Sequence, residues 1–167
     1  MKIYDILENH QIEEGPNDPA IFKAVFLAGG PGSGKSYVAT KILSGLGLKP
    51  VNSDEIYEYL ANKQDIDLGN PVDVISWRGQ EVRDRAKKLT DKRQNIYIDG
   101  RIGLIIDGTG KDVQKVKDQS EKLKTLGYEC SMIFVNTNLK VAQERNAARA
   151  RTIPAEMVQQ MWQKVQE

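Results

Sequence analysis

Eight residues early in the chain constrain its fold more than any other stretch. Residues 29–36, Gly-Gly-Pro-Gly-Ser-Gly-Lys-Ser, match the phosphate-binding pattern G-x-x-x-x-G-K-[ST] at every fixed position. An apolar run, residues 24–28, precedes them, and a segment with a helical pattern, residues 37–43, follows. A strand, a glycine-rich loop and a helix in this order give the pattern its physical meaning. The sequence therefore predicts a loop that binds a nucleoside triphosphate, rather than a turn that holds nothing.

The residues of this loop have separate expected roles. Glycines let the backbone wrap its N–H groups around a phosphate chain at the positive end of a helix. The Lys35 side chain is expected to reach the β- and γ-phosphates, and the Ser36 hydroxyl is expected to ligate Mg²⁺. The expected donor is ATP, with GTP left open, and Mg²⁺ is the expected metal. The predicted donor-binding residues of the loop are Gly30, Pro31, Gly32, Ser33, Gly34, Lys35 and Ser36.

The length and composition fit one folded domain. The chain has 167 residues, of which 40% are hydrophobic and 28% charged, and its formal net charge is +1. Nothing in this overall charge points to nucleic acid or an anionic membrane, so any basic site is expected to be local. One cysteine and one histidine exclude an internal disulfide and a cysteine/histidine zinc site. A leader-like segment and a long apolar run are absent, and we expect a cytoplasmic protein with no membrane contact and no obligate protein partner.

Asp54 is the first acidic residue with an expected catalytic role. It follows a short predicted strand, residues 48–51, and precedes a predicted helix, residues 56–61. Asn52 or Ser53 is suited to cap this helix, and the helix dipole favours an acid in the first turn. That structural explanation does not exclude catalysis, because the end of this strand is expected to face the triphosphate site. A carboxylate there can accept the proton of an attacking hydroxyl, so we predict that Asp54 is catalytic.

A second acid, Asp107, ends an apolar run at residues 104–106. A carboxylate at the end of a strand holds Mg²⁺ directly or through water in many nucleotide-binding proteins, so Asp107 is a predicted metal ligand. The alternative is that Asp107 caps the helix predicted over residues 111–126. Thr109 is better placed for the cap, and it is also a candidate for contact with the substrate.

Three arginines after the last predicted strand form the second distinctive feature. Arg145 and Arg149 are four residues apart, on one face of a predicted helix, and Arg151 follows. Guanidinium groups on a lid that closes over the phosphates would offset charge on the transferred phosphoryl group. We predict that Arg145 and Arg149 are catalytic and that Arg151 binds the donor. The alternative is exposed pairing with Glu144 or Glu156, which contributes at most about 1 kcal/mol.

The remaining pattern predicts helices and strands in alternation. A long helix is expected over residues 72–92, followed by an irregular connection over residues 96–102. Most basic residues of this helix are expected to be solvated; Arg78 is the exception, for which we predict contact with the acceptor. The apolar face of the long helix comprises Val72, Ile75, Val82, Ala86 and Leu89. Later elements are a strand over residues 128–135, a helix from residue 139 and a final helix whose first turn holds Pro154.

Taken together, these residues make the chain resemble the P-loop kinase superfamily, and within it the zeta-toxin and polynucleotide-kinase-like branch of bacteria and phages. The matching elements run over about residues 23–154. They are the loop at residues 29–36, Asn52-Ser53-Asp54, Ile106-Asp107-Gly108-Thr109, and Arg145-Asn146-x-x-Arg149-x-Arg151.

The resemblance implies a three-layer α/β P-loop NTPase fold, with a parallel sheet of four or five strands flanked by helices. It also implies strand order 2-3-1-4, Asp54 as the base that activates the acceptor, and lid arginines on the donor phosphates. Residues 1–22 are expected to be an N-terminal extension that packs on the core, and residues 23–167 the kinase domain, with a lid around residues 139–153. Two departures are evident. The family commonly has a fifth strand after the lid, where this chain ends in a helix, so we expect four strands or a chain without its C-terminal part. The phosphatase domain usual in phage polynucleotide kinases does not fit this length.

The function expected from these features is transfer of the ATP γ-phosphoryl group to a hydroxyl acceptor. Nucleosides, nucleotide sugars and polynucleotide 5′-hydroxyls all remain open as acceptors. The competing hypothesis is a nucleotide-dependent switch that hydrolyses slowly and transfers to no acceptor. No residue in the sequence is marked as a water-activating group, and the arginine-bearing lid favours transfer, because kinases must shield the phosphoryl group from water.

Overall fold

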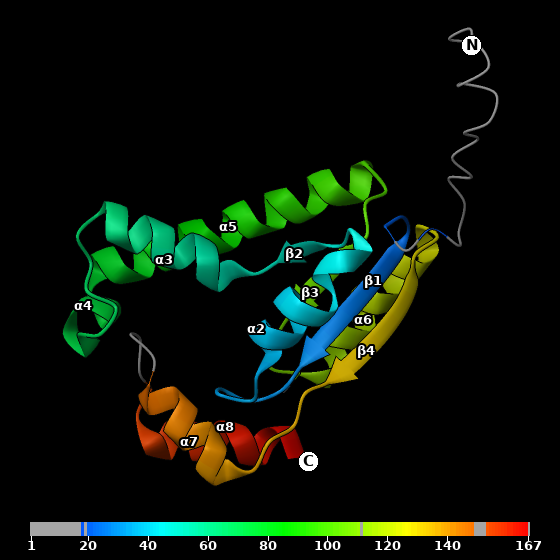
Figure 1. Cartoon of the computed structure of the whole chain (residues 1–167). Coiled ribbons are helices and arrows are strands. Elements are labelled where there is room, and N and C mark those ends of the chain that lie inside the picture. The colour runs from blue at the N-terminus through cyan, green and yellow to red at the C-terminus, as the bar shows by residue number, and fades with distance from the viewer. Residues whose placement is uncertain (1–17, 19, 111, 149–152, 167) are drawn as a thin grey trace, which may run out of the picture.

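The computed structural model is a parallel sheet with helices against both faces (Figure 1). It describes residues 18, 20–110, 112–148 and 153–166. The predicted packing of residues 1–22 therefore falls largely outside the described residues. The elements, in chain order, are β1 (Lys23–Ala28), α2 (Lys35–Tyr37), η1 (Val38–Ile42), η2 (Ser44–Leu46), β2 (Lys49–Val51), α3 (Ser53–Lys63), α4 (Pro71–Ile75), α5 (Trp77–Asp99), β3 (Leu104–Asp107), α6 (Val113–Thr125), β4 (Glu129–Phe134), α7 (Leu139–Ala147) and α8 (Ala155–Gln166).

The four strands are parallel and lie in the order β2-β3-β1-β4, which confirms the predicted order. In the centre of the sheet, Phe26 of β1 lies opposite Ile106 of β3 and Met132 of β4. Leu27 pairs with Asp107, so β1 and β3 end at the same edge. The loops that follow the strands therefore emerge side by side, which is where parallel sheets of this kind place their ligand sites.

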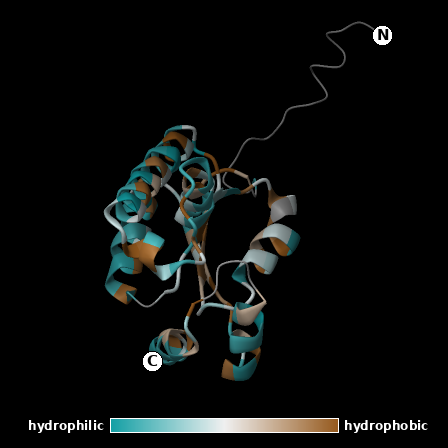
Figure 2. Ribbon diagram, turned by 90° about the vertical axis from the view of Figure 1, so that its left-hand side faces the viewer, coloured by the Kyte–Doolittle hydropathy of each residue, from teal (hydrophilic) through white to brown (hydrophobic). Residues whose placement is uncertain are grey.

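Two apolar layers hold the helices against the sheet, and Figure 2 shows the apolar strands between helices on both sides. Successive residues of a strand point to opposite faces, so β1 contributes to both layers. One layer contains Ala24, Phe26, Val51, Leu104, Leu123 and Tyr128. The other contains Val25, Leu27, Leu43, Leu48 and Ile105 and packs against η1.

A separate apolar cluster joins α3 to α5, which lie together beyond the β2 side of the sheet in Figure 1. Its buried residues are Ile56, Tyr57, Leu60, Ala61, Ile66, Val82 and Ala86. The prediction of one long helix over residues 72–92 was wrong at both ends. Ser76 is extended, with ψ 157°, and its hydroxyl accepts a hydrogen bond from Gly79 N at 3.0 Å, so α4 ends and α5 begins there. Val72, Ile75 and Leu89 are exposed, and α5 continues to Asp99 through most of the expected irregular connection.

The helix predicted after the glycine loop is irregular. Only α2 is α-helical, and it is followed by the π-helical turn η1 and the 3₁₀ turn η2. The Thr40 hydroxyl donates a hydrogen bond to Ser36 O at 2.8 Å. Such bonds from a side chain to the backbone compete with the regular helical pattern. Gly47, with φ +71°, ends the segment.

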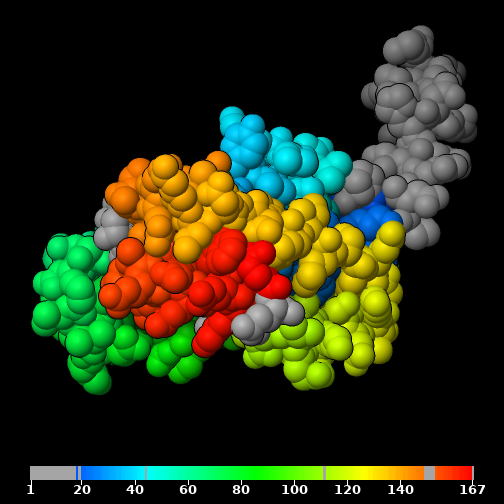
Figure 3. Space-filling view, turned by 90° about the horizontal axis from the view of Figure 1, so that it is seen from below, coloured from blue at the N-terminus to red at the C-terminus, as the bar shows by residue number. Residues whose placement is uncertain are grey.

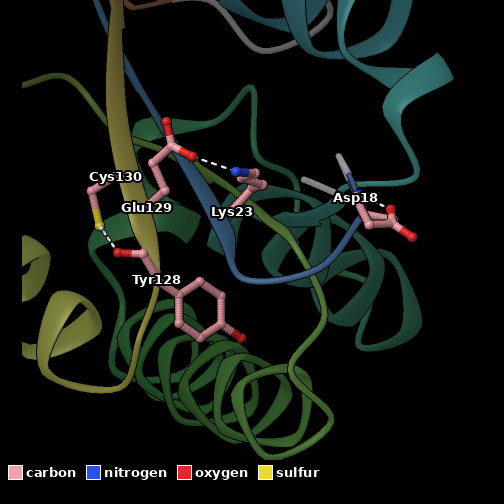
Figure 4. Close-up of polar contacts among 6 residues, drawn as sticks. Asp18, Lys23, Tyr128, Glu129 and Cys130 are labelled. Carbon is pink, nitrogen blue, oxygen red and sulfur yellow. Dashed lines mark hydrogen bonds and ion pairs between the residues drawn. The ribbon is translucent and has the colours of Figure 1, made fainter. Parts of the chain in front are cut away.

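The beginnings of β1 and β4 are joined by side chains drawn in Figure 4. Lys23 forms an ion pair with Glu129. The Cys130 Sγ lies 3.9 Å from Tyr128 O, and the thiol is half-buried. The Tyr128 hydroxyl donates a hydrogen bond to Ile102 O at 3.0 Å and so ties β4 to the loop before β3.

Tyr128 makes the stability of the protein depend on pH in the alkaline range. Burial raises the pKa of the Tyr128 hydroxyl above its ordinary value of 10.0. The neutral hydroxyl therefore contributes stability that is fully present below pH 10 and is lost as the pH rises through the raised pKa. Tyr128→Phe is expected to cost about 1 kcal/mol at pH 8 through the lost hydrogen bond and to remove this alkaline loss. Urea unfolding at pH 8 to 11 measures both effects, with the exposed Tyr37→Phe as the control. Equal alkaline losses in wild type and Tyr128→Phe would contradict the assignment.

Candidate active site

The glycine loop connects β1 to α2 through residues 29–34. Gly34 caps α2 with φ +106°, and Gly32 has φ +74°. A Cβ atom on Gly32 would overlap the carbonyl group of Ala142 in α7, so a side chain is excluded there by space as well as by conformation. The Lys35 ammonium donates hydrogen bonds to Gly29 O at 2.7 Å and Gly30 O at 3.1 Å, which hold this side chain back over the loop.

Helices α7 and α8 cover the loop. They lie side by side across the lower end of the sheet in Figure 1 and form the middle of the face in Figure 3. The Trp162 indole N–H donates to Thr137 O at 2.7 Å, and a Cβ atom on Gly30 would lie 3.6 Å from Trp162 Cα. The predicted phosphate site therefore has the glycine loop on one side and these two helices on the other.

Arg145 reaches from α7 to the glycine loop. Its guanidinium Nη1 donates to Gly32 O at 3.3 Å and to Ser33 O at 3.2 Å. The guanidinium group thus lies against the turn that is expected to hold the phosphates. Arg149 and Arg151 lie outside the described residues, so their roles stay predictions.

Asn146 is a residue of this region whose role the sequence analysis missed. Its buried side-chain amide donates to Ile153 O at 2.7 Å and accepts from Ile153 N at 3.2 Å. These two bonds join the end of α7 to the residues just before α8. The sequence did hold a signal for this role, because Asn146 is a polar residue on the same helix face as the buried Ala142.

Asn52 connects the backbone of Asp54, the predicted base, to the carboxylate of Asp107, the predicted metal ligand. Its side-chain Nδ2 donates to Asp107 Oδ2 at 3.0 Å, and its Oδ1 accepts from Asp54 N at 2.8 Å. One amide group therefore spans the ends of β2 and β3 and fixes the start of α3 relative to the Asp107 carboxylate. The sequence predicted only the capping half of this role, because the other half depends on β2 and β3 being neighbours.

Ser36 and Asp107 line the same pocket, of about 400 Å³, together with Thr40, Asn52 and Glu55. The half-buried Asp107 carboxylate and the Ser36 hydroxyl are hard oxygen ligands of the kind that Mg²⁺ prefers. Within the described ranges, no group of three or more Asp, Glu, His or Cys side chains is arranged to hold a metal by itself. One carboxylate, one hydroxyl and phosphate oxygens form the usual Mg²⁺ set in nucleotide sites, so these residues fit the predicted ion.

Replacing Asn52 by serine tests its bond to Asp107 separately from its bond to Asp54 N. Serine also caps helices, so α3 keeps its cap, while the donor to Asp107 Oδ2 is lost. Loss of a group that orients a metal ligand typically weakens metal affinity by about 10- to 100-fold, so the Mg²⁺ concentration for half-maximal ATP turnover should rise by that factor. Asn70→Ser is the matched control, because Asn70 caps α4 in the same way, accepting from Val72 N at 3.0 Å. An unchanged Mg²⁺ requirement in Asn52→Ser would argue against Asp107 as the metal ligand.

The structure places the two predicted substrate-binding residues differently. Thr109 borders the glycine loop, since its carbonyl oxygen accepts from Gly29 N at 3.1 Å. Arg78 is exposed and donates from Nη2 to Gln64 O at 3.1 Å, at the end of α3. Arg83 of the same helix stacks over the Tyr57 ring at 5.3 Å. These contacts hold α5 to α3, and acceptor binding by Arg78 stays a prediction without a geometric argument in its favour.

In the part of the chain that the structure describes, no helix is both long enough and apolar enough to cross a membrane.

Comparison with known proteins places the chain in a family. The AAA_33 family, described as an AAA domain, matches residues 25–167. Adenylate kinase of Thermotoga maritima is 28% identical over 127 residues, which are 75% of this chain and 57% of that protein. Adenylate kinase of Thermosipho melanesiensis is 33% identical over 106 residues, 63% of this chain and 48% of that protein. The chain thus spans about half the length of these two relatives.

A solved structure with a similar fold is the Pnkp1/Rnl/Hen1 RNA repair complex. One of its chains superposes with a TM-score of 0.66 at 20% identity, over 88% of this chain and 45% of that chain. A chain of the PezAT toxin–antitoxin system of Streptococcus pneumoniae gives a TM-score of 0.63 at 18% identity, over 86% and 57%. The chain belongs to the AAA_33 family and has a P-loop kinase fold.

Proposed function

We propose that this protein is an ATP-dependent phosphotransferase that moves the γ-phosphoryl group to a hydroxyl acceptor. The observation that carries the proposal is the arrangement around Asn52. The Asn52 side chain bonds to the backbone N–H of Asp54, the predicted base, and to the carboxylate of Asp107, the predicted metal ligand. Asp107 shares a pocket with Ser36 of the glycine loop. The kinase names of the relatives support the same class of reaction and ATP as the donor.

In the proposed reaction, the acceptor oxygen attacks the γ-phosphorus while the bond from this phosphorus to the bridging oxygen of ADP breaks. Asp54 accepts the proton of the hydroxyl. Lys35 and the loop N–H groups hold the phosphates, and Arg145 stabilises negative charge on the transferred group. Ser36 and Asp107 would hold Mg²⁺, whose charge offsets that of the β- and γ-phosphate oxygens.

A transfer assay with γ-labelled ATP and Mg²⁺ tests this function. Ribonucleosides, nucleotide sugars and 5′-hydroxyl oligonucleotides are offered separately, and the products are resolved by chromatography. We expect label on one class of acceptor. Release of labelled inorganic phosphate at the same rate in every mixture, with no labelled acceptor, would overturn the proposal.

A further inference from the structure

A groove of about 770 Å³ lies between α5 and α6, above the face of the sheet that carries Phe26. Each helix presents one face to it, since the lining residues of α5 recur at Lys87, Asp91 and Asn95. The floor is apolar and includes Phe26, Val51, Ile98, Ile106, Val116 and Leu123. A volume of this size, an apolar floor and a few polar groups are the usual properties of a site for a small molecule.

The groove ends at the predicted reaction centre. Asp107, Gly108 and Thr109 line it, and Asp107 also lines the 400 Å³ pocket that contains Ser36. Ser53, the neighbour of Asp54, lines it as well. The donor phosphates and the groove would therefore meet at Asp107.

We propose that this groove binds the phosphoryl acceptor and that the acceptor is a neutral nucleoside, rather than a nucleotide or a polynucleotide end. The inference rests on the proposed function, and it adds the location and the chemical class of the acceptor.

The charged residues that line the groove favour a neutral ligand. Apart from Asp107, three lysines line it, Lys87, Lys115 and Lys122, and three aspartates, Asp91, Asp112 and Asp118. Lys87 also forms an ion pair with Asp84 at 3.2 Å. A polynucleotide requires a positively charged channel along its phosphates, and these described residues provide no excess of positive charge.

Uncharged polar groups provide the hydrogen bonds that a nucleoside needs. Gln94 and Asn95 of α5 and Gln119 of α6 line the groove above its apolar floor. Gln119 Nε2 donates to Gln94 Oε1 at 3.4 Å, a long and therefore weak bond across the two helices. A ligand that brings its own donors and acceptors can replace this bond at little cost, while the flat face of a base packs on the apolar floor.

Matched ligand pairs test the inference. The four ribonucleosides are compared with their 5′-monophosphates and with a 5′-hydroxyl decanucleotide, by calorimetric binding to the full chain and by labelled transfer from ATP. One nucleoside should bind at least about ten-fold more tightly than its monophosphate, because the added dianion gains no net attraction. Its affinity should be the same at 50 and 200 mM salt, since phosphate contacts would make binding fall steeply with salt.

Two apolar substitutions locate the site. Gln94→Leu and Gln119→Leu keep the shape of the side chains and remove their hydrogen bonds, and each should raise the nucleoside Kd about ten-fold. Gln80→Leu, at an exposed position of α5 outside the groove, should leave the nucleoside Kd unchanged, although it loses the bond from Gln80 Nε2 to Val74 O at 2.8 Å. ATP affinity should be unchanged in all three variants.

The inference is overturned if a monophosphate or the decanucleotide binds more tightly than the nucleoside, or if no nucleoside binds. It is also overturned if the nucleoside Kd is the same in wild type, Gln94→Leu and Gln119→Leu. Nucleoside binding that depends on these two residues, without any transfer, would refute the proposed function and leave the groove as a nucleoside site. Transfer to the decanucleotide would support the proposed function and refute the inference that the groove binds a neutral nucleoside as the acceptor.

Discussion

Replacing Asp54 by asparagine is expected to lower kcat for phosphoryl transfer by about 10²- to 10⁴-fold, the usual contribution of a general base. Asparagine keeps the size of the side chain but cannot take the proton of the acceptor. The backbone N–H of residue 54 still bonds to Asn52 Oδ1, so the start of α3 and the link to Asp107 are preserved. ATP affinity should therefore stay within a factor of two or so, since the carboxylate does not hold the donor.

Glu58→Gln is the control for this experiment. Glu58 is an exposed acid on the same helix, one turn beyond Asp54, and it does not line the pocket that contains Ser36 and Asp107. If both variants lose activity equally, the effect of Asp54 is structural. If Asp54→Asn keeps full activity, Asp54 is not the base. Steady-state kinetics with a saturating acceptor distinguish these outcomes.

Replacing Lys35 by methionine is the second change with a large expected effect. In the structure its ammonium group donates to Gly29 O and Gly30 O, at the position where the phosphates are expected to bind. Loss of one preorganised donor to the transferred group typically costs about 10²- to 10³-fold in kcat. Weaker ATP binding should accompany this loss, because the same group holds the donor in the ground state.

Lys41→Met, an exposed lysine on η1, provides the control for general loss of positive charge. The bonds of Lys35 to the loop carbonyls also contribute to the conformation of the loop, so the Tm of each variant is measured first. Nearly wild-type transfer in Lys35→Met with an unchanged Tm would contradict the assignment of residues 29–36 as the phosphate-binding loop.

The strands and the loop were predictable because their signals are local. The apolar run before Gly29 and the strand that ends at Asp107 are each short, and their residue types alone specify buried parallel strands. The order β2-β3-β1-β4 came from family resemblance and is confirmed. Helix boundaries were less predictable. The apolar spacing through Val72 and Ile75 looked continuous, but the Ser76 hydroxyl caps α5 and divides the helix there.

The parts of the site that depend on two distant elements were not predictable. Asn52 gave a capping signal, but its bond to Asp107 exists only because β2 lies beside β3. The groove between α5 and α6 could not be predicted from either helix alone, since the sequence of each has the mixed charges of an exposed surface. Arg78 illustrates the reverse case: it was predicted to contact the acceptor, and in the structure its side chain donates to Gln64 O at the end of α3.

The stoichiometry of the reaction tests the central claim most directly. The wild-type protein is incubated with Mg²⁺, γ-labelled ATP and the acceptor selected by the transfer assay, and ADP, labelled acceptor and inorganic phosphate are quantified together. A phosphotransferase should form one labelled acceptor for each ADP, with little inorganic phosphate, and ADP formation should fall sharply when the acceptor is omitted. ADP formation that is matched by inorganic phosphate, whether or not the acceptor is present, would show a nucleotide-hydrolysing switch and contradict the account.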